Sequence, residues 1–221
     1  SRGERHEERS QHEQERAAVL GEARCSMFSL IAGLIRYLFS KTEINVLILG
    51  LDYAGKTTLL EQMKGIFKKV QGIPPSKIPP TVGLNVGKMD VGGCKLTFWD
   101  LGGQVRVRSL WEKYYADAHG LIFVMDSADV GRFEEARMAF GEYRQGAGEL
   151  HGVPLMMLAN KQDLPEAIST ADISVQFDMH KITKVAFRLQ PCSGLTCDGV
   201  TEGIHWIVDE AKKRARPRVD A

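Results

Sequence analysis

The stretch GLDYAGKT at residues 50–57 follows a continuous apolar run, Ile44 to Leu49, and leads into a segment with helical spacing that begins at Lys56. It fits the pattern G-x-x-x-x-G-K-[S/T], in which a glycine-rich loop between a buried strand and a helix surrounds phosphate groups. Backbone amides and the positive end of the helix dipole supply the attraction. The stretch therefore predicts a phosphate-binding loop, with a chance Gly-Lys-Thr turn as the alternative.

Within this loop, the residue types predict separate tasks. Lys56 is expected to reach between the β- and γ-phosphates, and the hydroxyl of Thr57 to coordinate Mg²⁺. The ring of Tyr53 has to point outward, because the phosphate contacts come from the backbone. The backbone amides expected around the phosphate are those of Asp52, Tyr53, Ala54, Gly55, Lys56, Thr57 and Thr58.

Strand-like and helix-like segments alternate along the rest of the chain, which predicts an α/β fold with helices on both faces of a mostly parallel sheet. Gly92-Gly93 supplies a hairpin turn, so one of six strands is expected to be an antiparallel edge strand. The expected strands are 44–49, 82–91, 94–99, 119–125, 153–159 and 185–189, and the expected helices are 56–67, 109–118, 132–150, 171–179 and 199–214.

A second polar motif, Asp100-Leu101-Gly102-Gly103-Gln104, ends the third expected strand. Ligands bind at the carboxyl edge of open α/β sheets, and this motif is expected there. Asp100 would hold Mg²⁺ through water, the amide of Gly103 would donate to a γ-phosphate, and Gln104 would orient an attacking water. Taken alone, the string could also be an ordinary turn.

A third motif, Asn160-Lys161-Gln162-Asp163, follows the fifth expected strand at the same edge. The carboxylate of Asp163 can accept hydrogen bonds from N1–H and the exocyclic amine of guanine, a donor pair that adenine lacks. The aliphatic stem of Lys161 can lie over the base, and Asn160 can tie this loop to the phosphate loop. An ordinary polar loop is the alternative for this motif alone.

Cys192-Ser193-Gly194 follows the last expected strand and could present backbone amides to the guanine carbonyl oxygen. This signal is weak by itself. The four motifs nevertheless stand in order, each at the carboxyl end of an expected strand, and together they predict a guanine-nucleotide site.

Composition sets the remaining bounds. The 221 residues carry 29 basic and 28 acidic side chains, a balance that argues against a nucleic-acid binder. The four cysteines form no CxxC pair, which favours reduced thiols. No apolar run approaches the roughly 20 residues of a membrane-spanning helix.

The chain is expected to have four parts. Residues 1–26 are charged and poor in aromatic side chains, which predicts a flexible extension; Met27 opens the patterned part, so a non-native origin of this extension is an alternative. Residues 27–41 form a helical pattern with one apolar stripe, either docked on the core or entering a membrane interface. The catalytic domain is expected at 42–215 and a tail at 216–221.

The motifs resemble those of the Arf/Arl family of small GTPases over nearly everything from Met27 onward. This resemblance implies a P-loop GTPase fold, GTP and GDP as ligands with Mg²⁺, and slow GTP hydrolysis by a monomer. The motifs that carry it are GLDYAGKTT (50–58), PTVGLNVG (80–87), FWDLGGQ (98–104), SLWEKYY (109–115), NKQDLP (160–165) and CSGLTCDGV (192–200).

The resemblance also implies two moving parts. Thr81 would coordinate Mg²⁺ only when a γ-phosphate is present, and the hairpin formed by 82–91 and 94–99 would slide in register and eject the N-terminal helix. Leu84, Trp99 and Tyr114 would lie in a hydrophobic patch that faces effectors.

Partners follow from the same resemblance: a GTPase-activating protein (GAP), an exchange factor, effectors, and a cytoplasmic location on Golgi or trans-Golgi membranes in vesicle traffic. Many family members carry myristate on a glycine after the initiator methionine, but Phe28 follows Met27 here. One branch of the family is thought to use an acetylated N-terminus and an integral membrane receptor instead.

Turnover is expected to depend on the GAP, because no arginine stands in the segment around Thr81 to neutralise the charge that develops during hydrolysis. Arg106 and Arg108 lie near Gln104, but they are expected to be solvated surface residues. Two rivals stay open at this point. A nucleotide-binding scaffold without meaningful turnover would be indifferent to Gln104→Leu, and an adenine-dependent phosphotransferase would prefer ATP to GDP.

Overall fold

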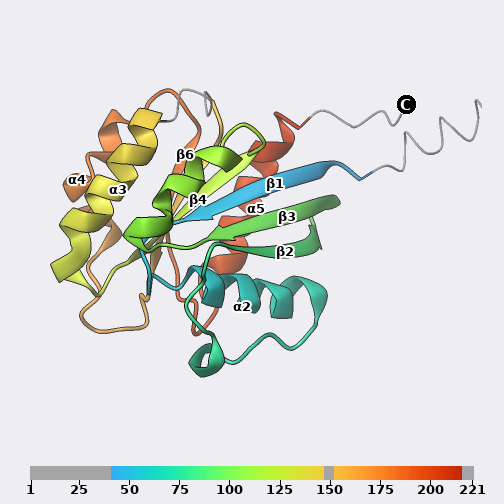
Figure 1. The fold of residues 1–221 in the computed structure, drawn as a ribbon, viewed down its shortest axis with the longest axis horizontal. Coiled ribbons are helices and arrows are strands. Elements are labelled where there is room, and N and C mark those ends of the chain that lie inside the picture. Colours follow the sequence, from blue (N-terminus) through green and yellow to red (C-terminus); the bar gives the residue numbers. More distant parts are fainter. Residues whose placement is uncertain (1–40, 147–151, 216–221) are drawn as a thin grey trace, which may run out of the picture. The chain divides into compact units, whose positions relative to one another are not determined.

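A six-stranded sheet runs through the part of the chain that the computed structural model describes, residues 41–146 and 152–215 (Figure 1). The strand order is β2-β3-β1-β4-β5-β6, and every neighbouring pair is parallel except β2–β3. This confirms the predicted sheet, including its single antiparallel edge strand. The strands are β1 (Glu43–Leu49), β2 (Leu84–Val91), β3 (Cys94–Leu101), β4 (Gly120–Asp126), β5 (Leu155–Asn160) and β6 (Phe187–Pro191).

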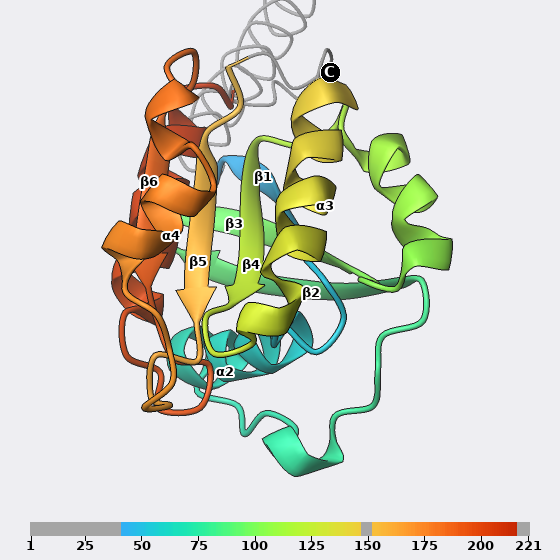
Figure 2. The ribbon, with the colours of Figure 1, turned by 90° about the vertical axis from the view of Figure 1, so that its left-hand side faces the viewer.

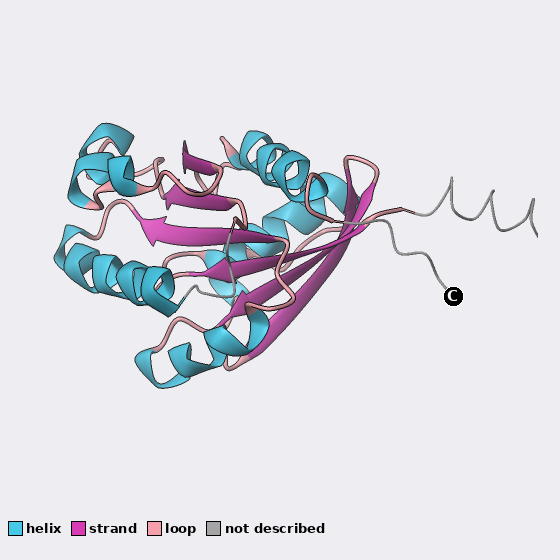
Figure 3. Ribbon diagram, turned by 90° about the horizontal axis from the view of Figure 1, so that it is seen from above, coloured by secondary structure: helices cyan, strands magenta, loops and turns pink. Residues whose placement is uncertain are grey.

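Helices cover both faces of the sheet, as Figures 2 and 3 show. Helices α2 (Lys56–Lys68) and α5 (Val200–Lys212) pack on one face, while α3 (Phe133–Gly146) and α4 (Thr170–Gln176) pack on the other. In Figure 2, β4 and β5 are visible between α4 on the left and α3 on the right. Short 3₁₀ helices lie at Pro75–Lys77, Val105–Tyr114, Val130–Arg132 and Met179–Lys181.

The central strand β1 explains why a continuous apolar run marks this fold. Leu47 and Leu49 are fully buried on the α3 side, whereas Val46 and Ile48 are buried on the side of α2 and α5. A strand covered on both faces has no solvent-facing positions, so its sequence does not alternate. The phosphate loop follows the carboxyl end of this buried central strand, so the loop lies at that edge of the sheet.

The β2–β3 hairpin closes through Gly92 and Gly93, whose φ angles are 56° and 80°. Two residues with positive φ are what a type I′ turn requires, so the predicted turn is confirmed. Strand β2 begins at Leu84 rather than at residue 82, because Gly83 has a φ of 80° and takes the chain out of the extended conformation. Strand β3 continues to Leu101, two residues beyond the prediction.

The helix expected at 109–118 is present with shifted bounds, as the 3₁₀ helix Val105–Tyr114. Trp111 is the buried residue of this helix, and a 3₁₀ helix with three residues per turn places the half-buried Arg108 and Tyr114 on the same face as Trp111. The indole nitrogen of Trp111 donates to the carbonyl of Gly102 at 3.1 Å, which holds the helix against the end of β3.

Other boundaries shift by a few residues. Helix α4 ends at Gln176, because Asp178 adopts a left-handed conformation (φ 51°), and β6 runs two residues later than expected. The predicted helix at 27–41 lies almost wholly outside the described residues, as do the extension 1–26 and the tail 216–221. No helix among the described residues is long and apolar enough to cross a membrane.

Candidate functional site

The phosphate loop leaves β1 at Gly50 and enters α2 at Lys56, with Gly50 at φ 135° and Gly55 at φ 94°. These angles need glycine, and a methyl group on Gly55 would lie 2.4 Å from the side-chain nitrogen of Asn160. The ammonium of Lys56 lies inside the loop and donates to the carbonyls of Gly50 at 3.0 Å and Leu51 at 2.7 Å. Burial lowers the pKa of Lys56 to about 8, although the nearby carboxylate of Asp100 opposes this shift.

Three oxygen-bearing residues predicted to hold a metal meet beside this loop. The hydroxyl of Thr57 lies 2.6 Å from that of Thr81 and donates to Asp100 Oδ2 at 2.7 Å, and the hydroxyl of Thr81 lies 3.5 Å from the same oxygen. Asn85, which the sequence did not single out, donates to Asp100 Oδ2 at 3.4 Å. The structure thus brings together residues from α2, the loop before β2, and β3.

This cluster has the donor set that suits Mg²⁺. Asp100 is fully buried, and its Oδ1 has no hydrogen-bond partner among the described residues. Burial raises the pKa of this carboxyl group, a cost that a cation would remove. Mg²⁺ favours one or two carboxylates with hydroxyl, water and phosphate oxygens, and the described residues hold no group of three or more His, Cys, Asp or Glu that would suit another metal. Mg²⁺ bound here would neutralise charge on nucleotide phosphates.

The segment after β3 packs directly on the phosphate loop. A methyl group on Gly103 would lie 2.2 Å from the amide nitrogen of Asp52, so the two backbones are in close contact. The amide of Gly102 donates to the carbonyl of Gly83 at 2.9 Å and links this segment to the one that carries Thr81. We call residues 102–114 switch II. Its Gln104 accepts a hydrogen bond at Oε1 from Arg106 Nε at 2.9 Å.

The motif after β5 is tied to the phosphate loop by one buried side chain. Asn160 donates from Nδ2 to the carbonyl of Ala54 at 2.8 Å, which is the contact expected from the sequence. Its Oδ1 accepts from the amide of Gly194 at 2.8 Å. Lys161, at φ 68°, forms an ion pair with Asp126 at 2.6 Å.

The amides of Cys192, Ser193 and Gly194 were expected to face a base carbonyl, and the structure corrects this expectation. They donate to the carbonyl of Ala159, the carbonyl of Asp198 and Asn160 Oδ1, respectively, so they present no free donors. Ser193 contributes instead through its hydroxyl, which donates to Asp163 Oδ1 at 2.5 Å. A backbone hydrogen-bond partner depends on how loops pack, and no residue pattern could have revealed it.

A cleft of about 300 Å³ joins the phosphate loop to switch II. Small-molecule sites have volumes of this order. Tyr53, with φ 61° and a side chain 72% exposed, lies on its lining, so the ring points outward as predicted. Asp163 and Ser193 lie outside this lining. Ten of the residues predicted from the sequence to form the site do line the cleft: Asp52, Tyr53, Gly55, Lys56, Thr57, Thr58, Thr81, Gly103, Gln104 and Lys161.

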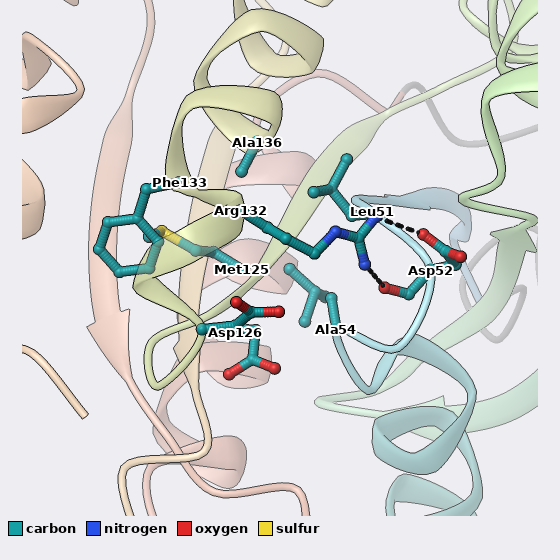
Figure 4. A pocket seen from close by; sticks show the side chains of 10 residues that line it. Leu51, Asp52, Ala54, Met125, Asp126, Arg132, Phe133 and Ala136 are labelled. Atoms are coloured by element: carbon teal, nitrogen blue, oxygen red, sulfur yellow. Dashed lines mark hydrogen bonds and ion pairs between the residues drawn. The ribbon is translucent and has the colours of Figure 1, made fainter. Parts of the chain in front are cut away.

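Three charged residues around the site were missed or misjudged from the sequence. Arg132 donates from Nη2 to Asp52 Oδ1 at 2.6 Å, as Figure 4 shows, and from Nη1 to the Asp52 carbonyl at 3.0 Å. The prediction that Arg108 is a solvated surface residue is wrong: its side chain is 13% exposed and contacts Gly103 and Glu135. No short motif contains Arg132 and Glu135, because they meet the site only through the tertiary fold.

The phosphate loop lies at one end of this arrangement and the polar side chains of Asn160, Lys161 and Asp163 at the other, on the carboxyl edge of a sheet with this strand order. That is the architecture of P-loop GTPases. The chain belongs to the ADP-ribosylation factor family, whose model matches residues 31–211.

Individual relatives agree. The chain is 51% identical to ADP-ribosylation factor-related protein 1 of Bos taurus over 82% of this chain and 92% of that protein. It is 40% identical to ADP-ribosylation factor-like protein 3 of Saccharomyces cerevisiae over 87% of this chain and 99% of that protein. The structure of the Arl6 BBS3 small GTPase from Trypanosoma brucei, with the bound nucleotide analogue GppNp, matches with a TM-score of 0.68 and 31% identity, over 79% of this chain and all of that one.

Membership of this family identifies the reaction that the site carries out. Arf-family proteins bind GTP and GDP with Mg²⁺ and hydrolyse GTP, and this chain is a small GTPase of that kind. The predicted resemblance is confirmed, and the adenine-dependent rival is excluded. Membership of this family implies that a GTPase-activating protein, an exchange factor and effector proteins act on this chain, but it does not identify them.

Proposed function

We propose that this GTPase acts as a membrane-recruited switch, which in its GTP form gathers effector proteins on Golgi or trans-Golgi membranes during vesicle traffic. The observation that carries the proposal is the contact between Thr81 and Thr57 beside Asp100. Thr81 precedes β2, so a γ-phosphate and Mg²⁺ at this point act on the hairpin next to it. Such ordering of a segment by γ-phosphate and its release on hydrolysis is an established switching device.

The proposed effector surface lies on β2 and its neighbours. Leu84 and Val86 are 38% and 43% exposed on this edge strand, and the rings of Trp99 and Tyr114 lie beside each other with centroids 5.4 Å apart. Apolar groups that gather on an exposed sheet edge favour partner binding. Because β2 adjoins Thr81, this surface is where a change of nucleotide would alter the shape offered to a partner.

Turnover without a partner is proposed to be slow. Among the described residues that line the cleft, the cationic ones are Lys56 and Lys161, and none is an arginine. Gln104 is moreover engaged by Arg106 instead of being free to orient water. An arginine from a GAP would supply the missing charge, an effect of about 10⁵-fold in Ras.

Membrane attachment is proposed to use residues 27–41 as an amphipathic helix, with the GTP form releasing it. The support is the apolar stripe of Met27, Ile31, Leu34 and Leu38, together with family membership. An integral membrane receptor that holds the N-terminus is part of the same proposal.

The test is co-sedimentation of purified protein with vesicles of Golgi-like lipid composition, loaded with GDP or a non-hydrolysable GTP analogue, with and without residues 1–26. We expect more bound protein in the GTP-analogue form. Thr81→Ala serves as the matched variant, and it should reduce the difference between the two nucleotide forms. Equal binding of both forms by the shorter chain would contradict the coupling of nucleotide to membrane.

A further inference from the structure

A chain of four charged side chains connects the phosphate loop with switch II. It begins at Asp52, whose carboxylate and carbonyl are both held by the guanidinium of Arg132. Arg132 is the last residue of the 3₁₀ turn before α3, and in Figure 4 its side chain reaches from the start of α3 to Asp52. A planar fork that grips two oxygens of one residue fixes its partner more firmly than a single ion pair.

The next link is Glu135 in the first turn of α3. Its two carboxylate oxygens take one arginine each: Oε2 accepts from Arg132 Nε at 2.9 Å, and Oε1 accepts from Arg108 Nη2 at 2.5 Å. The two arginines lower the pKa of Glu135, with Arg132 as the larger cause, so the group is ionised at neutral pH. Glu135 therefore bridges α3 to switch II.

The last link is a backbone group next to the catalytic glutamine. Arg108 Nε donates to the carbonyl of Gly103 at 3.0 Å. In a trans peptide the carbonyl and the following N–H point in opposite directions, so a fixed Gly103 carbonyl also fixes the direction of the Gln104 N–H. Gly103 itself lies against the amide of Asp52, so the chain of contacts closes into a ring around the cleft edge.

Isolated ion pairs on a surface contribute little, and this ring differs from them in two respects. Arg108 is 13% exposed, and the Glu135 carboxylate that it contacts is shared with Arg132. Arg108 and Arg132 also lie close enough to the phosphate loop to lower the pKa of Lys56.

We propose that Glu135 is a positioning residue for GTP hydrolysis, which holds Gly103 and Gln104 in register with the phosphate loop by sharing its carboxylate between Arg132 and Arg108. It touches no substrate and acts through the two arginines. The expected consequence of breaking the bridge is that nucleotide stays bound while Gln104 loses its orientation.

The neighbouring residue supplies a matched control. Glu134 lies in the same turn of α3 and pairs with Arg137 through two hydrogen bonds of 2.8 and 2.9 Å, but both side chains are at least half exposed. Glu134→Gln and Glu135→Gln therefore remove the same charge from the same helix turn. Only the second substitution interrupts the ring.

The experiment is single-turnover hydrolysis of pre-bound GTP with Mg²⁺, normalised to the nucleotide-loaded fraction, with dissociation of fluorescent GDP measured in parallel. We expect Glu135→Gln to slow hydrolysis roughly fivefold to tenfold, as for other networked positions, with GDP dissociation within about twofold of the parent. Glu134→Gln should leave both rates unchanged. Normalisation removes any loss from partial unfolding, so a slower rate reports on the loaded site.

Arg108→Lys and Arg132→Lys, singly and together, form a second test that does not depend on Glu135→Gln folding well. The two arginines share Glu135, so their effects on the hydrolysis rate should be non-additive. The proposal is overturned if Glu135→Gln hydrolyses GTP at the Glu134→Gln rate, or if the two arginine substitutions act additively.

Discussion

The side-chain amide of Asn160 donates to the carbonyl of Ala54 at 2.8 Å across 106 residues of sequence. The same side chain accepts from the amide of Gly194, and it is almost completely buried. One residue at the end of β5 therefore joins the phosphate loop to the loop after β6. Its loss affects both ends of the nucleotide site at once.

We expect Asn160→Ala to destabilise the fold by about 1–3 kcal/mol, because it leaves buried backbone groups at Ala54 and Gly194 unpaired. GDP should also dissociate faster. Urea denaturation and release of fluorescent GDP measure the two effects. Gln162→Ala is the control, since Gln162 lies two residues further on and its side chain donates to the carbonyl of Ile168. Unchanged GDP release would show that the bridge does not shape the site.

Asp163→Asn should weaken GDP binding at least about 100-fold, because an amide turns a donor toward the two donors of guanine. The hydroxyl of Ser193, 2.5 Å from Asp163 Oδ1, orients the carboxylate that is lost. Calorimetric titration with GDP and with ATP is the measurement. Asp172→Asn, on α4 away from the site, should bind GDP normally. A variant that binds GDP as the parent does would remove Asp163 from the base site.

A methyl group on Gly103 has no room, because the amide nitrogen of Asp52 would lie 2.2 Å from it. Gly103→Ala should push switch II off the phosphate loop and slow hydrolysis about 10- to 100-fold, with GDP still bound. The matched change is Gly141→Ala in α3, where a methyl group meets nothing within 4 Å and should stabilise the helix by about 0.5–1 kcal/mol. Normal hydrolysis by Gly103→Ala would mean that this close contact is not used in the reaction.

His119 predicts a dependence of stability on pH. Its Nδ1 accepts from the amide of Asn45 at 3.1 Å, and burial first, then Arg214, lowers its pKa below 6.5, while Asp117 opposes the shift. The unfolded chain therefore binds more protons just below pH 6.5, and stability must fall as the pH drops through that window. His119→Asn keeps an acceptor without a titrating group, so the difference in urea midpoint between the two proteins should change between pH 5 and 7. Parallel midpoints over this range would argue against a neutral, half-buried His119.

Tyr53 occupies a left-handed backbone conformation, which costs a bulky residue about 1–2 kcal/mol and asparagine less. Tyr53→Asn should therefore raise the free energy of unfolding by up to about 1 kcal/mol, measured by urea denaturation without nucleotide. A loss of stability would instead reveal that the exposed ring makes contacts worth more than the strain.

The order of motifs was readable from the sequence because local chemistry sets it. A buried apolar strand, a loop that needs glycine at Gly50 and Gly55, and polar residues at successive strand ends depend on neighbours in the chain. The Gly92-Gly93 turn is of the same kind. For these elements the sequence was sufficient, and it placed the nucleotide site on the correct edge of the sheet.

What only the tertiary structure decided is which groups meet. The 3₁₀ helix at residues 105–114 is anchored by Trp111 on Gly102, and the amides at 192–194 donate to Ala159, Asp198 and Asn160. Arg132 and Glu135 lie outside every motif quoted from the sequence, and they reach Asp52 and Arg108 only because α3 begins beside the phosphate loop. Such contacts pair side chains distant in sequence, and no local pattern determines them. The sequence by itself determined that this chain holds a guanine nucleotide on a parallel sheet, and the packing of α3 against the loop decided how switch II is held to it.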